Sequence, residues 1–256
     1  MPTQLLIYET AVPVSFQHHG RWSVEVGTDY AFSRNVNALP LMAVEFPRAA
    51  AEYAIVFADG GSAEPMPLVI LGVRVKENLY LSSDNQWQAK YIPAFARRYP
   101  FVFSRSEDGK TFTLCIDSAF SGINQQGRGQ SLFEEDGKAA PYTEGVLKFL
   151  QDYEAQFALT QVFCRKLKEL DLLEPMQAQV TVAGGEKLSL TGFLAVSRAK
   201  LRALSGEHLA ELAKTDELEL LYLHLNSMRN FNEVKDRYVA LRGAAVEAPE
   251  AETAAT

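Results

Sequence analysis

The hydrophobic pattern divides the chain into a strand-like first part and a helix-like second part. Up to about residue 140, short apolar runs alternate with clusters of turn-forming residues, as in strands joined by turns. From Val146 to Leu167, apolar side chains recur at steps of three and four, the spacing of one helical face. The pattern predicts an α+β fold, in which a mainly antiparallel, β-rich N-terminal part packs against C-terminal helices and a small hairpin.

The clearest local prediction in the first part is a β-hairpin. The β-rich runs 101–105 and 111–117 flank Asp108-Gly109, a pair that favours a tight turn. The other strands expected in this part are QLLIY (4–8), RWSVEV (21–26), ALPLMAVEF (38–46), AIVF (54–57), PLVILGV (67–73) and NLYLS (78–82).

The second part is expected to open with a long helix capped by Thr143. A second hairpin is expected over QAQVTV and EKLSLTGFLAV, followed by short helices; ELELLYLHL (217–225) fits either a strand or a helix. We therefore divide the chain into a β-rich part, 1–140, and a mainly helical part, 141–242, which share one core. The tail 243–256 has few bulky residues and is expected to be disordered.

Charge and hydropathy narrow the classes of partner. The net charge of −7 argues against a nucleic-acid partner, because such proteins present a basic face. No apolar run reaches the length of about 20 residues that spans a bilayer. The N-terminus lacks the basic region of a signal peptide, and the two cysteines suit free thiols in a reducing compartment. These features predict a cytoplasmic protein.

The sequence offers no recognisable catalytic or metal-binding motif. Glycine-rich nucleotide loops and the G-x-S-x-G nucleophile motif do not occur, and the cysteines are isolated. His18 and His19 are adjacent, so on a strand they would point to opposite faces. We therefore assign no catalytic residue, no metal and no cofactor. The enzyme alternative is an acid/base role for His224, Asp117 or Glu45 on a peptide or amino acid.

The stretch YIPAFARRYPFVF (91–103) places two arginines among apolar residues. A short helix is expected over 93–98, since Pro93 suits a first helical turn and Pro100 disfavours helix at the residue before it. Adjacent helical residues diverge by about 100°, so either Arg97 or Arg98 is expected to point inward. A buried guanidinium needs an acid or a bound anion, and we expect Glu45, in the apolar run LMAVEF, to pair with one of the two.

These residues also define a candidate ligand site. The structural interpretation is an internal ion pair; the functional one adds Trp87, Tyr91 and Asn78 as walls of a pocket for a carboxylate or a peptide terminus. His224 and Asn230, near the start of the expected last helix, are further candidates, with a structural role in the core as the alternative.

Several segments resemble the SapC family of bacterial proteins. They are NALPLMAVEF, AEYAIVF, LGVRVKENLYL, WQAKYIPAFARRYPFVF, LCID, SLFEEDGK and the C-terminal stretch from LTGFLAV to LHLNSMRN, so the resemblance covers about residues 5–241. The chain departs from the common family pattern at Tyr53-Ala54, where Tyr-Pro is usual. The resemblance implies an accessory or binding protein in uptake or modification of a peptide or amino-acid-like compound, holding that ligand or a partner enzyme. The family name implies a surface-layer structural role as an alternative.

Overall fold

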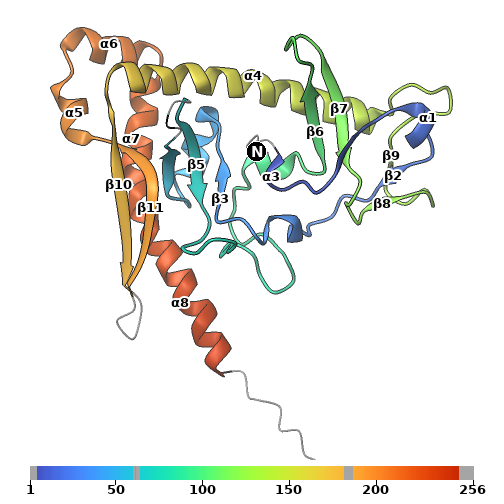
Figure 1. Ribbon diagram of the computed structural model, residues 1–256, viewed down its shortest axis with the longest axis horizontal. Coiled ribbons are helices and arrows are strands. Elements are labelled where there is room, and N and C mark those ends of the chain that lie inside the picture. Colours follow the sequence, from blue (N-terminus) through green and yellow to red (C-terminus); the bar gives the residue numbers. More distant parts are fainter. Residues whose placement is uncertain (1–4, 60, 62–63, 182–186, 248–256) are drawn as a thin grey trace, which may run out of the picture.

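The computed structural model describes residues 5–59, 61, 64–181 and 187–247 and has an α+β fold. Three antiparallel sheets lie side by side beneath one long helix, α4 (Pro141–Glu169), as Figure 1 shows. The turn of the second predicted hairpin and most of the tail lie outside the described residues.

The largest sheet has five strands and draws on both parts of the chain. Its order is β10-β11-β4-β5-β3, with every neighbouring pair antiparallel. The predicted second hairpin forms β10 and β11, and β11 pairs with β4 from the first part. The strands are β3 (Ala38–Pro40), β4 (Ile55–Ala58), β5 (Met66–Ile70), β10 (Leu173–Thr181) and β11 (Lys187–Val196).

Two smaller sheets complete the β structure. The hairpin predicted around Asp108-Gly109 is confirmed as β6 (Phe101–Arg105) and β7 (Phe112–Asp117), with β1 (Ala11–Pro13) on the other side of β7. The third sheet is a small one, in which β2 (Ser23–Val24) lies between β8 (Ile123–Asn124) and β9 (Gln130–Ser131).

The C-terminal helices pack on the five-stranded sheet, where α7 contacts β4 and β11 and α8 contacts β10. The remaining helices are α1 (Phe16–His19), α2 (Phe46–Ala49), α3 (Ala94–Arg97), α5 (Arg198–Ala203), α6 (Gly206–Lys214), α7 (Glu217–Ser227) and α8 (Phe231–Glu247), with 3-10 turns η2 (Ala31–Ser33), η3 (Ala43–Glu45) and η4 (Met228–Asn230).

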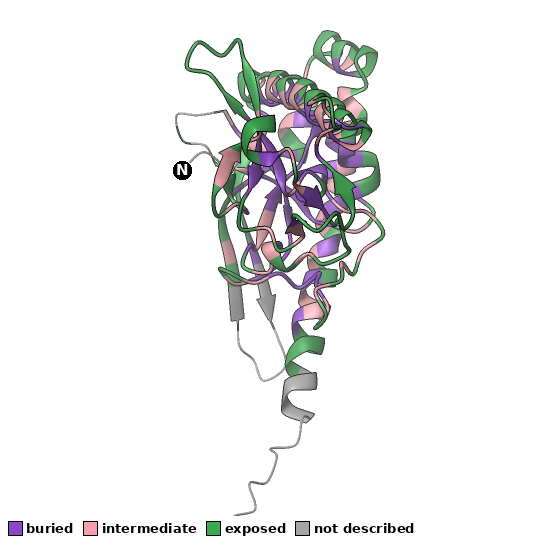
Figure 2. Cartoon of the chain, turned by 90° about the vertical axis from the view of Figure 1, so that its right-hand side faces the viewer, coloured by how far each residue is buried: buried purple, intermediate pink, exposed green. Residues whose placement is uncertain are grey.

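The main hydrophobic core joins residues of both parts of the chain. It runs from Ile7 through the strands of the large sheet to Tyr238 in α8. A second cluster lies between α4 and the β6–β7 hairpin. Figure 2 shows the buried residues gathered in the strands beneath α4, while the outer faces of the helices are exposed. The predicted helical face of α4 is confirmed, with Leu150, Tyr153 and Cys164 among its buried residues.

Some local predictions were wrong for identifiable reasons. Leu5–Ile7 form a turn rather than a strand, and Leu5 and Leu6 are exposed. The long helix begins at Pro141, which suits a first helical position, and the hydroxyl of Thr143 donates to the Leu132 carbonyl instead of capping. The segment 217–225, for which the sequence left strand or helix open, is helical in α7, with Leu221 and His224 buried.

Other expected strands are shorter than predicted. RWSVEV contributes only β2, and ALPLMAVEF leaves the sheet after Pro40 and turns into η3. NLYLS forms a single bridge, between Leu81 and Trp87. The predicted run lengths failed because buried apolar residues also occur in turns and short helices, where hydropathy alone does not fix the backbone.

None of the helices in the described part of the chain combines the length and apolar composition needed to cross a bilayer.

Candidate functional site

The two arginines of α3 point in different directions, as predicted. Arg98 is 3% exposed, and its guanidinium lies over the rings of Phe95, Tyr153 and Tyr8, at 4.2, 4.8 and 5.6 Å from their centroids. Arg97 is exposed at the surface. Burial raises the pKa of the Tyr8 hydroxyl, and the nearby Arg98 cation opposes that rise. Arg98 is thus a core cation surrounded by aromatic faces.

Glu45 is buried, and three hydrogen-bond donors reach its carboxylate. Its Oε1 accepts hydrogen bonds from the Tyr91 hydroxyl at 2.6 Å and the Ala94 N–H at 2.7 Å, and its Oε2 accepts the Met42 N–H at 2.8 Å. The expected pairing of Glu45 with Arg97 or Arg98 stays a prediction. The bonds from Met42 and Ala94 have a physical reason: Glu45 ends the 3-10 turn η3 and faces the free N–H at the start of α3, so backbone donors reach its carboxylate.

Tyr91 links the buried carboxylate to the exposed arginine. Burial raises the pKa of its hydroxyl, and the Glu45 carboxylate raises that pKa further. Tyr91 therefore stays protonated and donates a hydrogen bond to Glu45. The Arg97 guanidinium carbon lies 5.9 Å from the centroid of the Tyr91 ring and 5.4 Å from that of Phe149 on α4. Arg97 Nε donates to the Ile92 carbonyl at 3.0 Å, which fixes the direction of the side chain.

A cavity of about 310 Å³ opens between α3, α4 and η3 beside these groups. Its wall is largely apolar, and two cations, Arg48 and Arg97, stand with the carboxylate of Asp152 around it. We call it the Arg97 cavity; its lining is Met42, Val44, Glu45, Arg48, Tyr91, Ala94, Arg97, Phe149, Asp152, Tyr153 and Gln156.

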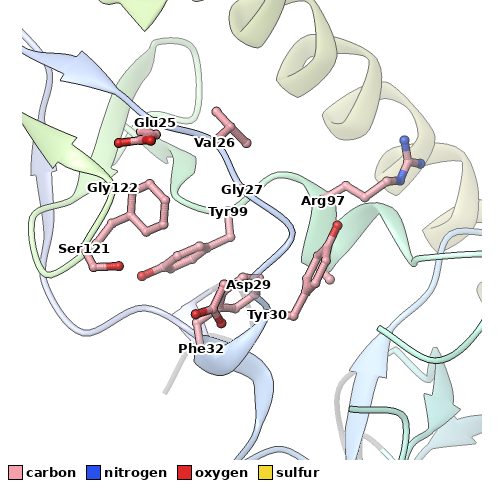
Figure 3. Close-up of a pocket in the computed structure, with 12 residues that line it drawn as sticks. Glu25, Val26, Gly27, Asp29, Tyr30, Phe32, Arg97, Tyr99, Ser121 and Gly122 are labelled. Atoms are coloured by element: carbon pink, nitrogen blue, oxygen red, sulfur yellow. The ribbon is translucent and has the colours of Figure 1, made fainter. Parts of the chain in front are cut away.

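Arg97 also borders a second hollow of about 400 Å³, on the other side of α3, shown in Figure 3. In that view the Arg97 guanidinium points away from the labelled carboxylates of Glu25 and Asp29. The charged end of Arg97 therefore belongs to the Arg97 cavity, and only the rest of the residue borders the second hollow.

Trp87 and Asn78 do not line the Arg97 cavity. Trp87 Nε1 donates to the Tyr53 hydroxyl at 2.7 Å, and that hydroxyl donates to the Tyr91 carbonyl. Asn78 is buried, donates to the Ser33 carbonyl and accepts the Tyr80 N–H. Glu52, which the sequence did not single out, accepts the Tyr91 N–H at 3.0 Å. Glu45, Glu52 and Tyr53 together hold the segment that leads into α3.

His224 and Asn230 lie in the core under the five-stranded sheet, apart from the Arg97 cavity. His224 is 0% exposed, accepts the Val196 N–H through Nε2 and packs against the Phe57 ring. Burial lowers its pKa to about 4, so the ring is neutral near pH 7. Asn230 donates to the carbonyls of Ala50 and Tyr53. The geometry favours the structural interpretation for both residues.

Asp117, the remaining acid/base candidate, is also 0% exposed. Its carboxylate accepts the N–H groups of Glu9, Thr10 and Ala119, which fastens the chain leading into β1. Among the residues that the structure describes, no three His, Cys, Asp or Glu gather closely enough to hold a metal ion.

The sequence match now decides the family. The model of the SapC family matches residues 14–234, which is most of the chain and includes every residue of the Arg97 cavity. The chain belongs to the SapC family. No curated protein and no solved structure matches it. Membership in the SapC family thus confirms the resemblance found in the sequence.

Part of the site in this SapC chain was not visible in the sequence. Phe149 and Asp152 face Tyr91 and Arg97 only because α4 packs beside η3, and Arg48 comes from α2. Phe149 and Tyr153 lie four residues apart on the predicted α4 face, with Asp152 beside them. An acid next to two aromatic residues was the one feature of the sequence that could have pointed to this part of the site.

Proposed function

We propose that the chain is a non-enzymatic accessory protein whose Arg97 cavity binds the carboxylate of a peptide terminus or an amino-acid-like molecule. The observation that carries the proposal is the fixed position of Arg97. Its Nε donates to the Ile92 carbonyl, and its guanidinium carbon lies 5.9 Å and 5.4 Å from the Tyr91 and Phe149 ring centroids, so the guanidinium is pre-organised at the cavity. An arginine ordered in advance loses less entropy when it binds an anion.

The charges around the cavity suit a zwitterionic or peptide-like ligand. Arg97 and Arg48 supply positive charge for a carboxylate, and Asp152 supplies a partner for an amine. The side chains of Met42, Val44 and Phe149 supply an apolar wall, as small-molecule sites commonly have. Glu45 is committed to three donors and is therefore a positioning residue for Tyr91 and α3 rather than a ligand contact.

Binding is favoured over catalysis because two of the three candidates for proton transfer are inaccessible and the third already accepts several hydrogen bonds. His224 and Asp117 are completely buried and accept backbone N–H groups. Glu45 borders the cavity, but its two oxygens already accept three donors. A general acid or base has to reach a substrate proton within hydrogen-bond distance.

The proposal predicts discrimination between a carboxylate and its amide. N-acetyl-leucine should bind to the full chain at least about tenfold more tightly than N-acetyl-leucinamide, because only the acid can pair with Arg97. Arg97→Ala should weaken binding of the acid about tenfold and leave binding of the amide unchanged. NMR titration of isotope-labelled protein measures both affinities and locates the shifted resonances.

Arg202→Ala is the matched control, since Arg202 is exposed on α5, away from the cavity. It should bind the acid like the wild type. Equal affinity for the acid and the amide, or shifted resonances away from α3 and η3, would rule out the proposed site.

A further inference from the structure

We propose that the second hollow is a binding site for an organic cation, an alkylammonium or methylated ammonium group. The hollow has a volume of about 400 Å³ and is bordered by four aromatic residues, Tyr30, Phe32, Tyr99 and Phe120, together with Glu25 and Asp29. Aromatic faces and carboxylates in one concave surface are the combination that recognises such cations. We call this hollow the aromatic hollow.

The aromatic rings form a connected wall. Tyr99 stacks on Phe32 with 4.0 Å between ring centroids, and Phe120 meets Tyr99 edge to face at 5.5 Å. Tyr30 lies 5.8 Å from Phe32 in a tilted arrangement. All four side chains are only partly buried, so they border the space instead of filling the core. A wall of this kind offers negative ring faces to a cation at low ordering cost.

The charge of the aromatic hollow is negative. In Figure 3 the carboxylates of Glu25 and Asp29 stand on two sides of the hollow, with Tyr99 between them. Asp29 uses Oδ1 to accept the Ala31 N–H, and Glu25 has a long, exposed ion pair of 3.8 Å with Arg128. An exposed pair at that distance is weak, so Glu25 keeps its capacity to attract a cation. The guanidinium of Arg97, the one cation in the lining, points away.

The two segments that carry these groups are held close to each other. The Glu25 N–H donates to the Gly122 carbonyl at 2.9 Å. A Cβ on Gly122 would lie 2.4 Å from the Glu25 carbonyl oxygen, so this approach requires glycine. The Tyr30 N–H donates to the Asn85 carbonyl, and Arg34 holds the Asn85 side chain. The backbone that carries the hollow is thus held in place by hydrogen bonds.

This site is separate from the Arg97 cavity and has the opposite charge preference. The aromatic hollow lies on the other face of α3 and takes a cation, while the Arg97 cavity takes an anion. Either proposal can therefore fail without the other.

Choline and its uncharged analogue 3,3-dimethylbutan-1-ol test the charge requirement at nearly constant shape. We expect choline to bind the full chain about tenfold more tightly than the alcohol, in an NMR titration that shifts resonances of residues 25–32 and 120–122. Asp29→Asn and Tyr30→Leu should each weaken binding of choline by about threefold to tenfold. Asp84→Asn and Tyr222→Leu, exposed controls outside the hollow, should bind choline like the wild type.

A second experiment tests which kind of molecule carries the ammonium group. Binding of N-acetyl-lysine N-methylamide at the same residues would indicate a lysine side chain of a peptide, and binding of choline alone would indicate a free methylated ammonium compound; both outcomes support the site. Equal affinity for choline and the alcohol, no binding of any ammonium probe, or an unchanged affinity in both variants would overturn it. Urea denaturation of the same variants, with a midpoint close to that of the wild type, shows that the variants are folded.

Discussion

Replacing Glu45 with leucine is expected to lower the free energy of unfolding by about 4 kcal/mol. The carboxylate is 4% exposed and accepts hydrogen bonds from the Tyr91 hydroxyl and from the N–H groups of Ala94 and Met42. Leucine would leave three donors without an acceptor, at about 1–3 kcal/mol each, and removing the need to bury a charge offsets part of that cost. Urea denaturation of wild type and variant measures the difference.

Glu45→Gln should have a smaller effect, about 2 kcal/mol. Its amide oxygen still accepts from two donors, but its NH₂ group would face the Met42 N–H, which is also a donor. Glu107→Gln, an exposed substitution in the β6–β7 turn, is the control and should change stability by less than about 0.5 kcal/mol. If Glu45→Leu were as stable as the wild type, the description of Glu45 as the residue that anchors α3 would be wrong.

The second large effect is a pH-dependent loss of stability caused by His224. Burial lowers the pKa of this ring to about 4 in the folded chain, whereas the unfolded chain has the ordinary value near 6.5. Between these values the unfolded state binds a proton that the folded state does not, so stability is full above about pH 6.5 and falls as the pH falls. The loss attributable to His224 should reach roughly 3 kcal/mol at pH 4.

The His224→Gln variant isolates this contribution from that of other titrating groups. It is expected to be less stable than the wild type at pH 7, because the Val196 N–H loses a well-placed acceptor, but to lose about 3 kcal/mol less between pH 7 and pH 4. His208→Gln, exposed on α6, should follow the wild-type pH dependence. Parallel stability curves for wild type and His224→Gln would refute the assignment.

The parts of the fold that could be predicted are those fixed by local chemistry. Asp108-Gly109 identified the β6–β7 hairpin, and the three-and-four spacing identified the buried face of α4. What could not be predicted depends on tertiary contacts. Pro175, a residue type that commonly ends regular structure, lies inside β10, where it is tolerated because β10 is at the edge of its sheet.

The candidate site was likewise predictable only in part. The apolar residues on both sides of Arg97 and Arg98 were enough to predict that one arginine would be buried, and Arg98 is buried. The backbone donors to Glu45 could not be predicted, because the sequence gives no measure of which backbone N–H groups a turn leaves free. The Phe149 and Asp152 side of the cavity needs α4 to pack beside η3, which no local pattern contains.

The order of strands in the large sheet has a consequence for synthesis. β11 lies between β10 and β4, so β4 keeps an open edge while the ribosome is still making the last third of the protein. The Ser227 hydroxyl, which accepts the Ile55 N–H, arrives later still. An unpaired edge of apolar residues invites association with other nascent chains. We therefore expect the large sheet to close only after β11 has left the ribosome.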